Sequence, residues 1–255
     1  MQKKQAKTGT TPTSTGRAKL TLYPFQEATV GQLLHNKKIA ILKTGMGKTA
    51  VAMRWLFFKT RQTGKRKVLI VTTATKAKSG DMQVEAKMWN GDDWADTLES
   101  FEVVSWHMFG KWTLQNAARL RDYVYVFDEV QKCKGYTSGM GLAYRRVCSR
   151  TRDWSGYTAT PGDKWIDLMP YFVGSGLVKN KTDFMRKYCV VQTFKGYPEI
   201  VNYLNEDLLV EMWRSITSIP DTGQAEREPP AERHNVGEFK APSYYKTAIK
   251  TRMKE

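Results

Sequence analysis

Five short runs of β-branched and aromatic residues alternate with helical stretches between residues 20 and 160, and this alternation constrains the fold more than any other feature of the sequence. The runs are apolar at nearly every position, which is typical of parallel strands covered by helices on both faces. Strand alternating with helix predicts an α/β fold, a parallel sheet flanked by helices. The predicted strands are 38–43, 67–73, 101–106, 123–127 and 154–160, and the predicted helices are 49–60, 81–90, 111–121 and 140–150.

The two ends of the chain differ in composition from the part between them. Residues 1–19 carry five basic side chains and no acidic one, so we expect a disordered basic tail there. Residues 20–217 form the predicted α/β domain, which becomes mainly helical after Pro170. This helical C-terminal extension is followed by residues 218–255, which begin with a stretch rich in Pro, Glu and Arg and are expected to be a linker.

The charge balance points to a polyanionic partner. Lys and Arg number 41 against 25 Asp and Glu, a net charge of +16, which favours nucleic acid over a merely basic protein without such a partner. No apolar run approaches the ~18 residues of a transmembrane helix, and the N-terminus lacks the apolar segment of a secretory signal. Three widely spaced cysteines fit a reducing compartment, so we expect a cytoplasmic protein, with the nucleus as an alternative.

A glycine-containing loop joins the first predicted strand to the first predicted helix. Glycines let backbone N–H groups approach phosphates closely, and the start of the helix adds partial positive charge. Lys48 is then placed to reach the β- and γ-phosphates and Thr49 to bind Mg²⁺. The full phosphate-loop pattern requires a glycine where Leu42 stands, so a chance match is the alternative. The loop residues are Thr44, Gly45, Met46, Gly47, Lys48 and Thr49.

Two adjacent carboxylates, Asp128 and Glu129, end the very apolar strand YVYVF. Open α/β sheets bind ligands at the carboxyl ends of their strands. Asp128 is therefore placed to hold Mg²⁺, and Glu129 to orient or deprotonate an attacking water. The alternative is an acidic pair that only decorates the start of a helix.

The ordered set GMGKT (45–49), DEVQ (128–131) and TATP (158–161) resembles helicase superfamily II, and more closely its Swi/Snf-like ATPase branch. Four further segments agree with this family: LYPFQ (22–26), VLIVTTATK (68–76), VVSWHMF (103–109) and DFMRKYCV (183–190). The resemblance covers about residues 20–245 and implies a RecA-like P-loop domain. The compact domain also resembles phage-encoded members.

The resemblance implies a role for each matching residue in binding and hydrolysing ATP with Mg²⁺. Gln26 would contact adenine, Lys48 and Thr49 would bind the triphosphate and the metal, Asp128 would hold the metal, and Glu129 would activate water. The resemblance also implies roles for two further sets of residues. Gln131, Thr158 and Thr160 would couple the nucleotide to the nucleic-acid surface, and Thr73, Lys76 and Ser105 would face the nucleic-acid backbone, with DNA favoured.

Family members work with two RecA-like lobes, and the second supplies arginine fingers. No segment resembling that lobe follows in this sequence. We therefore expect the chain to bind ATP but to hydrolyse it poorly unless a second lobe is supplied in trans, since an arginine finger is worth roughly 10³–10⁵ in rate. Two alternatives are a non-hydrolysing, nucleotide-gated subunit for nucleic-acid binding or docking, and an unrelated P-loop kinase.

Two groups of side chains each have a structural and a functional interpretation. Aromatic residues among basic ones can stack bases, although core packing is the commoner role of tryptophan. Three arginines of one predicted helix would form either a strip that faces phosphates or a solvated surface. The tryptophans are Trp89, Trp94, Trp106 and Trp112, and the arginines are Arg145, Arg146 and Arg150.

Overall fold

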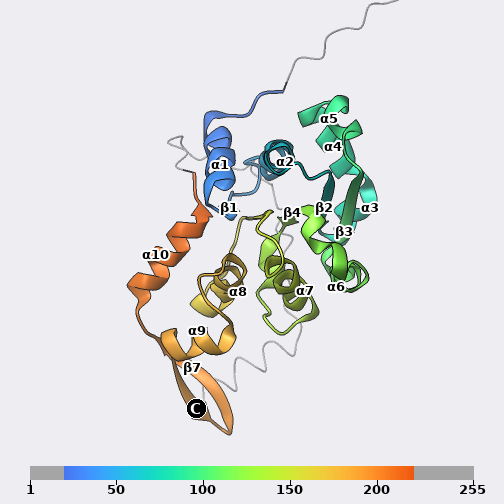
Figure 1. Cartoon of the computed structure of the whole chain (residues 1–255). Coiled ribbons are helices and arrows are strands. Elements are labelled where there is room, and N and C mark those ends of the chain that lie inside the picture. The colour runs from blue at the N-terminus through green and yellow to red at the C-terminus, as the bar shows by residue number, and fades with distance from the viewer. Residues whose placement is uncertain (1–19, 221–255) are drawn as a thin grey trace, which may run out of the picture. The chain divides into compact units, whose positions relative to one another are not determined.

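The structure, a computed structural model, describes residues 20–220; the expected tail 1–19 and residues 221–255 of the expected linker lie outside them. Its centre is a six-stranded sheet in the order β3-β2-β4-β5-β1-β8, parallel at every pairing (Figure 1). The predicted α/β fold with a parallel sheet is thereby confirmed. The strands are β1 (Ile39–Ile41), β2 (Lys67–Thr72), β3 (Ser100–Ser105), β4 (Tyr123–Asp128), β5 (Trp154–Thr158) and β8 (Thr217–Ser218).

Helices cover both faces of the sheet because successive residues of each buried strand point to opposite faces. Val124 and Val126 of β4 belong to one core cluster, while Tyr125 and Phe127 belong to the other. The first face packs against α1 (Pro24–His35), α2 (Lys48–Thr63), α4 (Asp81–Asn90) and α5 (Asp92–Asp96). The second packs against α6 (Trp106–Gln115), α7 (Gly139–Cys148), α8 (Trp165–Ser175), α9 (Lys181–Tyr188) and α10 (Glu206–Ile216).

The remaining elements include several that the sequence did not predict. An antiparallel hairpin follows α9, where we expected mainly helix, and α1 and β8 were also missed. The helix expected over 111–121 begins at Trp106 instead, because the Ser105 hydroxyl accepts a hydrogen bond from the Met108 N–H and caps it. The other elements are α3 (Ala74–Ser79), η1 (Ala117–Asp122), η2 (Val130–Cys133), β6 (Cys189–Phe194) and β7 (Tyr197–Tyr203).

Most of the tryptophans and arginines that had two interpretations serve packing. Trp94, Trp106 and Trp112 are buried in the two core clusters. Arg145 lies 3.7 Å from the centre of the Tyr136 ring, and Arg146 donates a hydrogen bond of 2.7 Å to the Thr113 hydroxyl; Arg150 is exposed. The guanidinium groups of these three arginines therefore do not form a continuous strip of free groups.

The carboxyl ends of all the sheet strands meet at one edge, because every pairing is parallel. The loops that follow β1, β2, β4 and β5 therefore lie together, and they contain most of the predicted site residues. Among residues 20–220, none of the helices is both long and apolar enough to cross a bilayer.

Candidate functional site

The loop after β1 has the backbone conformation of an anion-binding turn. Gly45 and Gly47 have φ values of 84° and 75°, in the left-handed region that favours glycine. Gly47 caps α2, so the helix begins at Lys48 and its first N–H groups face the loop. Within the loop, Lys48 Nζ donates to the Leu42 carbonyl at 3.3 Å. Exposed backbone N–H groups and a helix N-terminus together favour a phosphate group.

A cavity of about 550 Å³ opens over this loop. One side is formed by the loop and the start of α2, and the other by α3, α4 and the residue after β4. This volume lies in the range of ordinary small-molecule pockets. Its lining residues are Leu20, Thr44, Gly45, Gly47, Lys48, Thr49, Ala50, Lys76, Glu85, Met88, Trp89 and Glu129.

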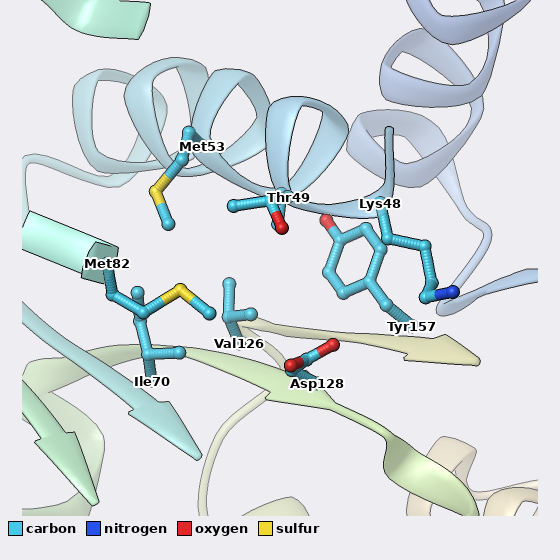
Figure 2. A pocket seen from close by; sticks show the side chains of 9 residues that line it. Lys48, Thr49, Met53, Ile70, Met82, Val126, Asp128 and Tyr157 are labelled. Carbon is cyan, nitrogen blue, oxygen red and sulfur yellow. The ribbon is translucent and has the colours of Figure 1, made fainter. Parts of the chain in front are cut away.

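A second, much smaller cavity of about 10 Å³ lies between α2 and the sheet, and it is lined by Lys48, Thr49, Asp128 and Tyr157 among others. Figure 2 shows the Thr49 hydroxyl directed from α2 toward β4, which carries Asp128. Burial raises the pKa of Tyr157, so its hydroxyl stays protonated. The remaining lining residues of this cavity are apolar. The Thr49 hydroxyl and the Asp128 carboxylate at its border are oxygen groups of the kind that Mg²⁺ prefers.

Asp128 is held in place by three hydrogen bonds. Its Oδ2 accepts one from the Thr72 hydroxyl at 2.7 Å and one from Lys76 Nζ at 3.0 Å. Its backbone carbonyl accepts a third from Trp106 Nε1 at 2.7 Å. The residue is only 6 % exposed, so its carboxylate depends on Thr72 and Lys76 for compensation of its charge.

Glu129 has an unusual backbone conformation for a residue with a side chain. Its φ and ψ are 52° and 49°, in the left-handed region, which costs roughly 1–2 kcal/mol. Its Oε2 accepts a hydrogen bond from Gln131 Nε2 at 2.8 Å, and its side chain lines the larger cavity. Gln131 Oε1 is buried and has no hydrogen-bond partner among the described residues. Gln131 therefore bonds Glu129, and its expected coupling role stays a prediction.

Gln26 connects α1 to the phosphate-binding loop. Its Nε2 donates to the Met46 carbonyl at 3.0 Å, and its Oε1 accepts from the Tyr23 N–H at 2.9 Å. Gln26 is 5 % exposed, and these two bonds use one of the two N–H hydrogens and one of the two lone pairs of its amide. The expected contact with adenine stays a prediction.

The two threonines of the TATP segment lie beside the loop after β1. Thr158 is fully buried, and its hydroxyl accepts from the Thr160 N–H at 3.0 Å. Its carbonyl accepts from the Leu42 N–H at 2.9 Å, which ties the end of β5 to the start of the loop. Thr160 is exposed. This arrangement links the segment to the candidate phosphate site, and the coupling role stays a prediction.

The three residues expected to face a nucleic-acid backbone occupy different environments. Ser105 is buried and caps α6, so its hydroxyl is not available at the surface. Lys76 faces Asp128 and the larger cavity instead of pointing away from the site. Thr73 is half-buried at the start of α3, with no hydrogen bond from its hydroxyl to the helix. Ser105 and Lys76 are thus engaged with other residues of the protein, and the expected nucleic-acid contacts of all three residues stay predictions.

Sequence reasoning missed several residues of the site. Thr72 is the last residue of β2 and bonds Asp128 directly. Glu85 accepts a hydrogen bond from Trp89 Nε1 at 3.0 Å, and both side chains line the larger cavity from α4. A polar residue at the end of an apolar strand was an available signal for Thr72. The sequence held no comparable signal for α4, because its approach to the loop depends on tertiary packing.

The chain was compared with protein families, curated proteins and solved structures. No family model and no curated protein matches it. Among solved structures, it resembles the SWI2/SNF2 ATPase core of Sulfolobus solfataricus, determined in complex with double-stranded DNA, with a TM-score of 0.59 at 15 % identity over 79 % of this chain. The match covers 45 % of that structure's chain, so this chain spans less than half its length.

Two further structures give weaker matches. The Hef helicase domain of Pyrococcus furiosus has a TM-score of 0.49 at 17 % identity, covering 66 % of this chain and 40 % of that one. The UvsW helicase of bacteriophage T4 has a TM-score of 0.46 at 17 % identity, covering 63 % and 60 %. At these identities only the architecture is shared. Together with the six-stranded parallel sheet, the SWI2/SNF2 comparison shows that residues 20–220 adopt a RecA-like α/β fold of the kind found in helicase-like ATPase cores.

Proposed function

We propose that this chain is the ATP-binding domain of a helicase- or translocase-like ATPase that hydrolyses ATP with Mg²⁺ to drive movement on nucleic acid. The observation that supports this most is the meeting of two motifs at one sheet edge. The loop with Lys48 and Thr49 faces the carboxylates of Asp128 and Glu129 across adjoining cavities. This is the set of groups that in-line phosphoryl transfer to water requires.

The residues present fit both the triphosphate and the metal. Backbone N–H groups of Gly45, Gly47 and the first turn of α2 would bind the phosphates. Lys48 would turn from the Leu42 carbonyl toward them. Thr49 and Asp128 would hold Mg²⁺, which supplies charge neutralisation on the phosphate oxygens when bound. Glu129 would hold a water in line with the γ-phosphate and accept its proton, with Gln131 fixing the carboxylate.

The proposed partner is nucleic acid, with DNA favoured. The net charge of +16 supports a polyanionic partner, and the SWI2/SNF2 structure with a comparable fold was determined on double-stranded DNA. A second RecA-like lobe, in the same protein or in trans, would supply arginine to the γ-phosphate. Turnover by residues 1–255 alone is then expected to be slow.

The experiment compares nucleotide binding with hydrolysis. Lys48→Ala should abolish binding of a fluorescent ATP analogue. Glu129→Gln should retain binding but lower single-turnover hydrolysis by about 10²–10⁴, the usual contribution of a general base. Glu99→Gln, at the exposed residue that precedes β3, is the matched control and should change neither. Hydrolysis unaffected by Glu129→Gln would rule out its role, and binding without any turnover would favour the nucleotide-gated binding subunit.

A further inference from the structure

The ion pair between Lys76 and Asp128 is unequal in its exposure. Nζ of Lys76 lies 3.0 Å from Oδ2 of Asp128, but the Asp128 side chain is 9 % exposed whereas that of Lys76 is 40 % exposed. The carboxylate is fixed by its strand and by the Thr72 hydroxyl. The ammonium, by contrast, sits on a flexible stem with open space beside it in the larger cavity. Lys76 is therefore the partner that is free to leave.

The same carboxylate is the proposed ligand of the metal. A buried carboxylate needs a compensating cation, and the Lys76 ammonium supplies one. A divalent cation arriving between Thr49 and Asp128 would lie within a few ångströms of the Lys76 ammonium. Two cations so close repel one another, and both draw on the same oxygens.

Lys76 also ties a weakly anchored element to the sheet. It belongs to α3, a helix of six residues (Ala74–Ser79) with no buried residue of its own. Its neighbour Lys78, two residues further on, is exposed. Because α3 lacks an apolar anchor, loss of the ion pair should make its backbone open more readily.

We propose that Lys76 competes with the divalent cation for Asp128, so that arrival of the metal releases Lys76 and loosens α3. Lys76 is thus a positioning residue: its release when the metal binds changes the mobility of α3, at the surface beside the site. The inference rests on the proposed function, because it takes Asp128 as a metal ligand.

The first test measures the Mg²⁺ concentration needed for half-maximal binding of a fluorescent, non-hydrolysable ATP analogue. Lys76→Gln removes the competitor and should lower this midpoint at least threefold. Lys78→Gln removes the same charge from the same helix without touching Asp128, so it should leave the midpoint unchanged in this assay, which contains no nucleic acid. Lys76→Arg keeps a competing cation and should stay near the wild type. An unchanged or higher midpoint for Lys76→Gln would overturn the proposal.

The second test omits the nucleotide. Binding of Mn²⁺, followed by loss of the free-ion electron paramagnetic resonance signal, should be tighter in Lys76→Gln than in the wild type. Amide hydrogen exchange of 74–79 should quicken in the wild type when Mn²⁺ is added, and should be fast from the start in Lys76→Gln. Equal Mn²⁺ affinities would overturn the competition. A wild type that binds Mn²⁺ but no nucleotide would instead refute the proposed ATP site and leave the competition standing.

Discussion

At the scale of single residues, two glycines of the loop after β1 allow backbone strain and steric overlap to be told apart. Gly45 and Gly47 both have positive φ values, so a side chain at either position is strained. At Gly47 a Cβ atom would also overlap Gln26 Nε2, whereas at Gly45 it would meet nothing within 4 Å. Gly47 therefore allows the close approach of α1 to the loop.

We predict that Gly47→Ala destabilises the protein by more than Gly45→Ala. Gly45→Ala should cost about 1–2 kcal/mol from backbone strain alone, and Gly47→Ala should cost more because Gln26 must move. Urea unfolding of both variants measures the difference. In a Gln26→Ala background the two glycine substitutions should become equally costly. If the excess cost of Gly47→Ala persists there, the contact with Gln26 is not its cause.

Lys38 gives a prediction about pH. Burial lowers its pKa from 10.5 to about 8, and the charge of Lys59 adds to this effect. The folded state therefore disfavours the charged amine, so folding is penalised below pH 8 and the penalty disappears as pH rises toward 10.5. The unfolding free energy should increase across this window, by an amount on the order of 1–3 kcal/mol.

Lys38→Met should remove this dependence between pH 8 and 10.5, and urea unfolding at several pH values checks it. The substitution also removes the bond that Nζ donates to the Arg152 carbonyl at 2.6 Å, so the comparison rests on the slope and not on the absolute stability. Lys111→Met, on the exposed face of α6, should leave the slope as in the wild type. An unaltered slope in Lys38→Met would assign the pH dependence to other groups.

At the scale of elements, the strands and the loop were predictable because each depends on local sequence. The run YVYVF is apolar on both faces, and glycine marks the turn after β1. The hairpin of β6 and β7 was missed because its residues are mostly exposed and give no continuous apolar run. The start of α6 was missed because one capping side chain, Ser105, decides it.

The site was predictable only in part, for a related reason. Parallel strands bring Thr49, Asp128 and Thr158 to one edge whatever the details of packing. The direction of the Lys76 side chain depends instead on how the six-residue helix α3 leaves β2. Its partner Asp128 lies 52 residues further along the chain. Sequence patterns do not encode that direction, so the ion pair could not be foreseen.

Glu102 joins three elements at the outer edge of the sheet. It accepts hydrogen bonds from Trp112 of α6, Tyr123 of β4 and Ser100 of β3, at 2.8, 2.8 and 3.0 Å. Partial burial raises its pKa, but these donors outweigh burial and leave the pKa below the usual value. The stabilisation is therefore present above about pH 4.5 and lost as pH falls through the folded value.

We predict that Glu102→Gln lowers the unfolding free energy at pH 7 by about 1 kcal/mol, the typical cost of an impaired hydrogen bond, and by less at pH 3.5. Urea unfolding at both pH values measures this. Glu99→Gln, an exposed residue with a 3.7 Å ion pair to Lys67, is the control and should have little effect at either. A loss that is equal at both pH values would mean that the charge of Glu102 does not contribute.

At the scale of the whole molecule, the sheet divides the surface into two edges of different proposed function. The carboxyl edge holds the cavities and the loops after the strands, including α3 with Lys78. The amino edge holds the segments that precede the strands, such as η1 before β4, which contains Arg121. If the excess positive charge serves nucleic-acid binding at the carboxyl edge, equal charges removed from the two edges should have unequal effects.

We predict that binding to DNA weakens at least tenfold between 50 and 200 mM salt, because neutralised phosphates release their counterions. Lys78→Gln should weaken binding and reduce the slope of log K against log salt by about 1, as loss of one phosphate contact does. Arg121→Gln removes the same charge from the amino edge and should leave the slope unchanged. Fluorescence anisotropy of a labelled duplex across the salt range measures all three. Affinity that is insensitive to salt would argue against a phosphate-contacting surface, and equal slopes for the two variants would place that surface away from α3.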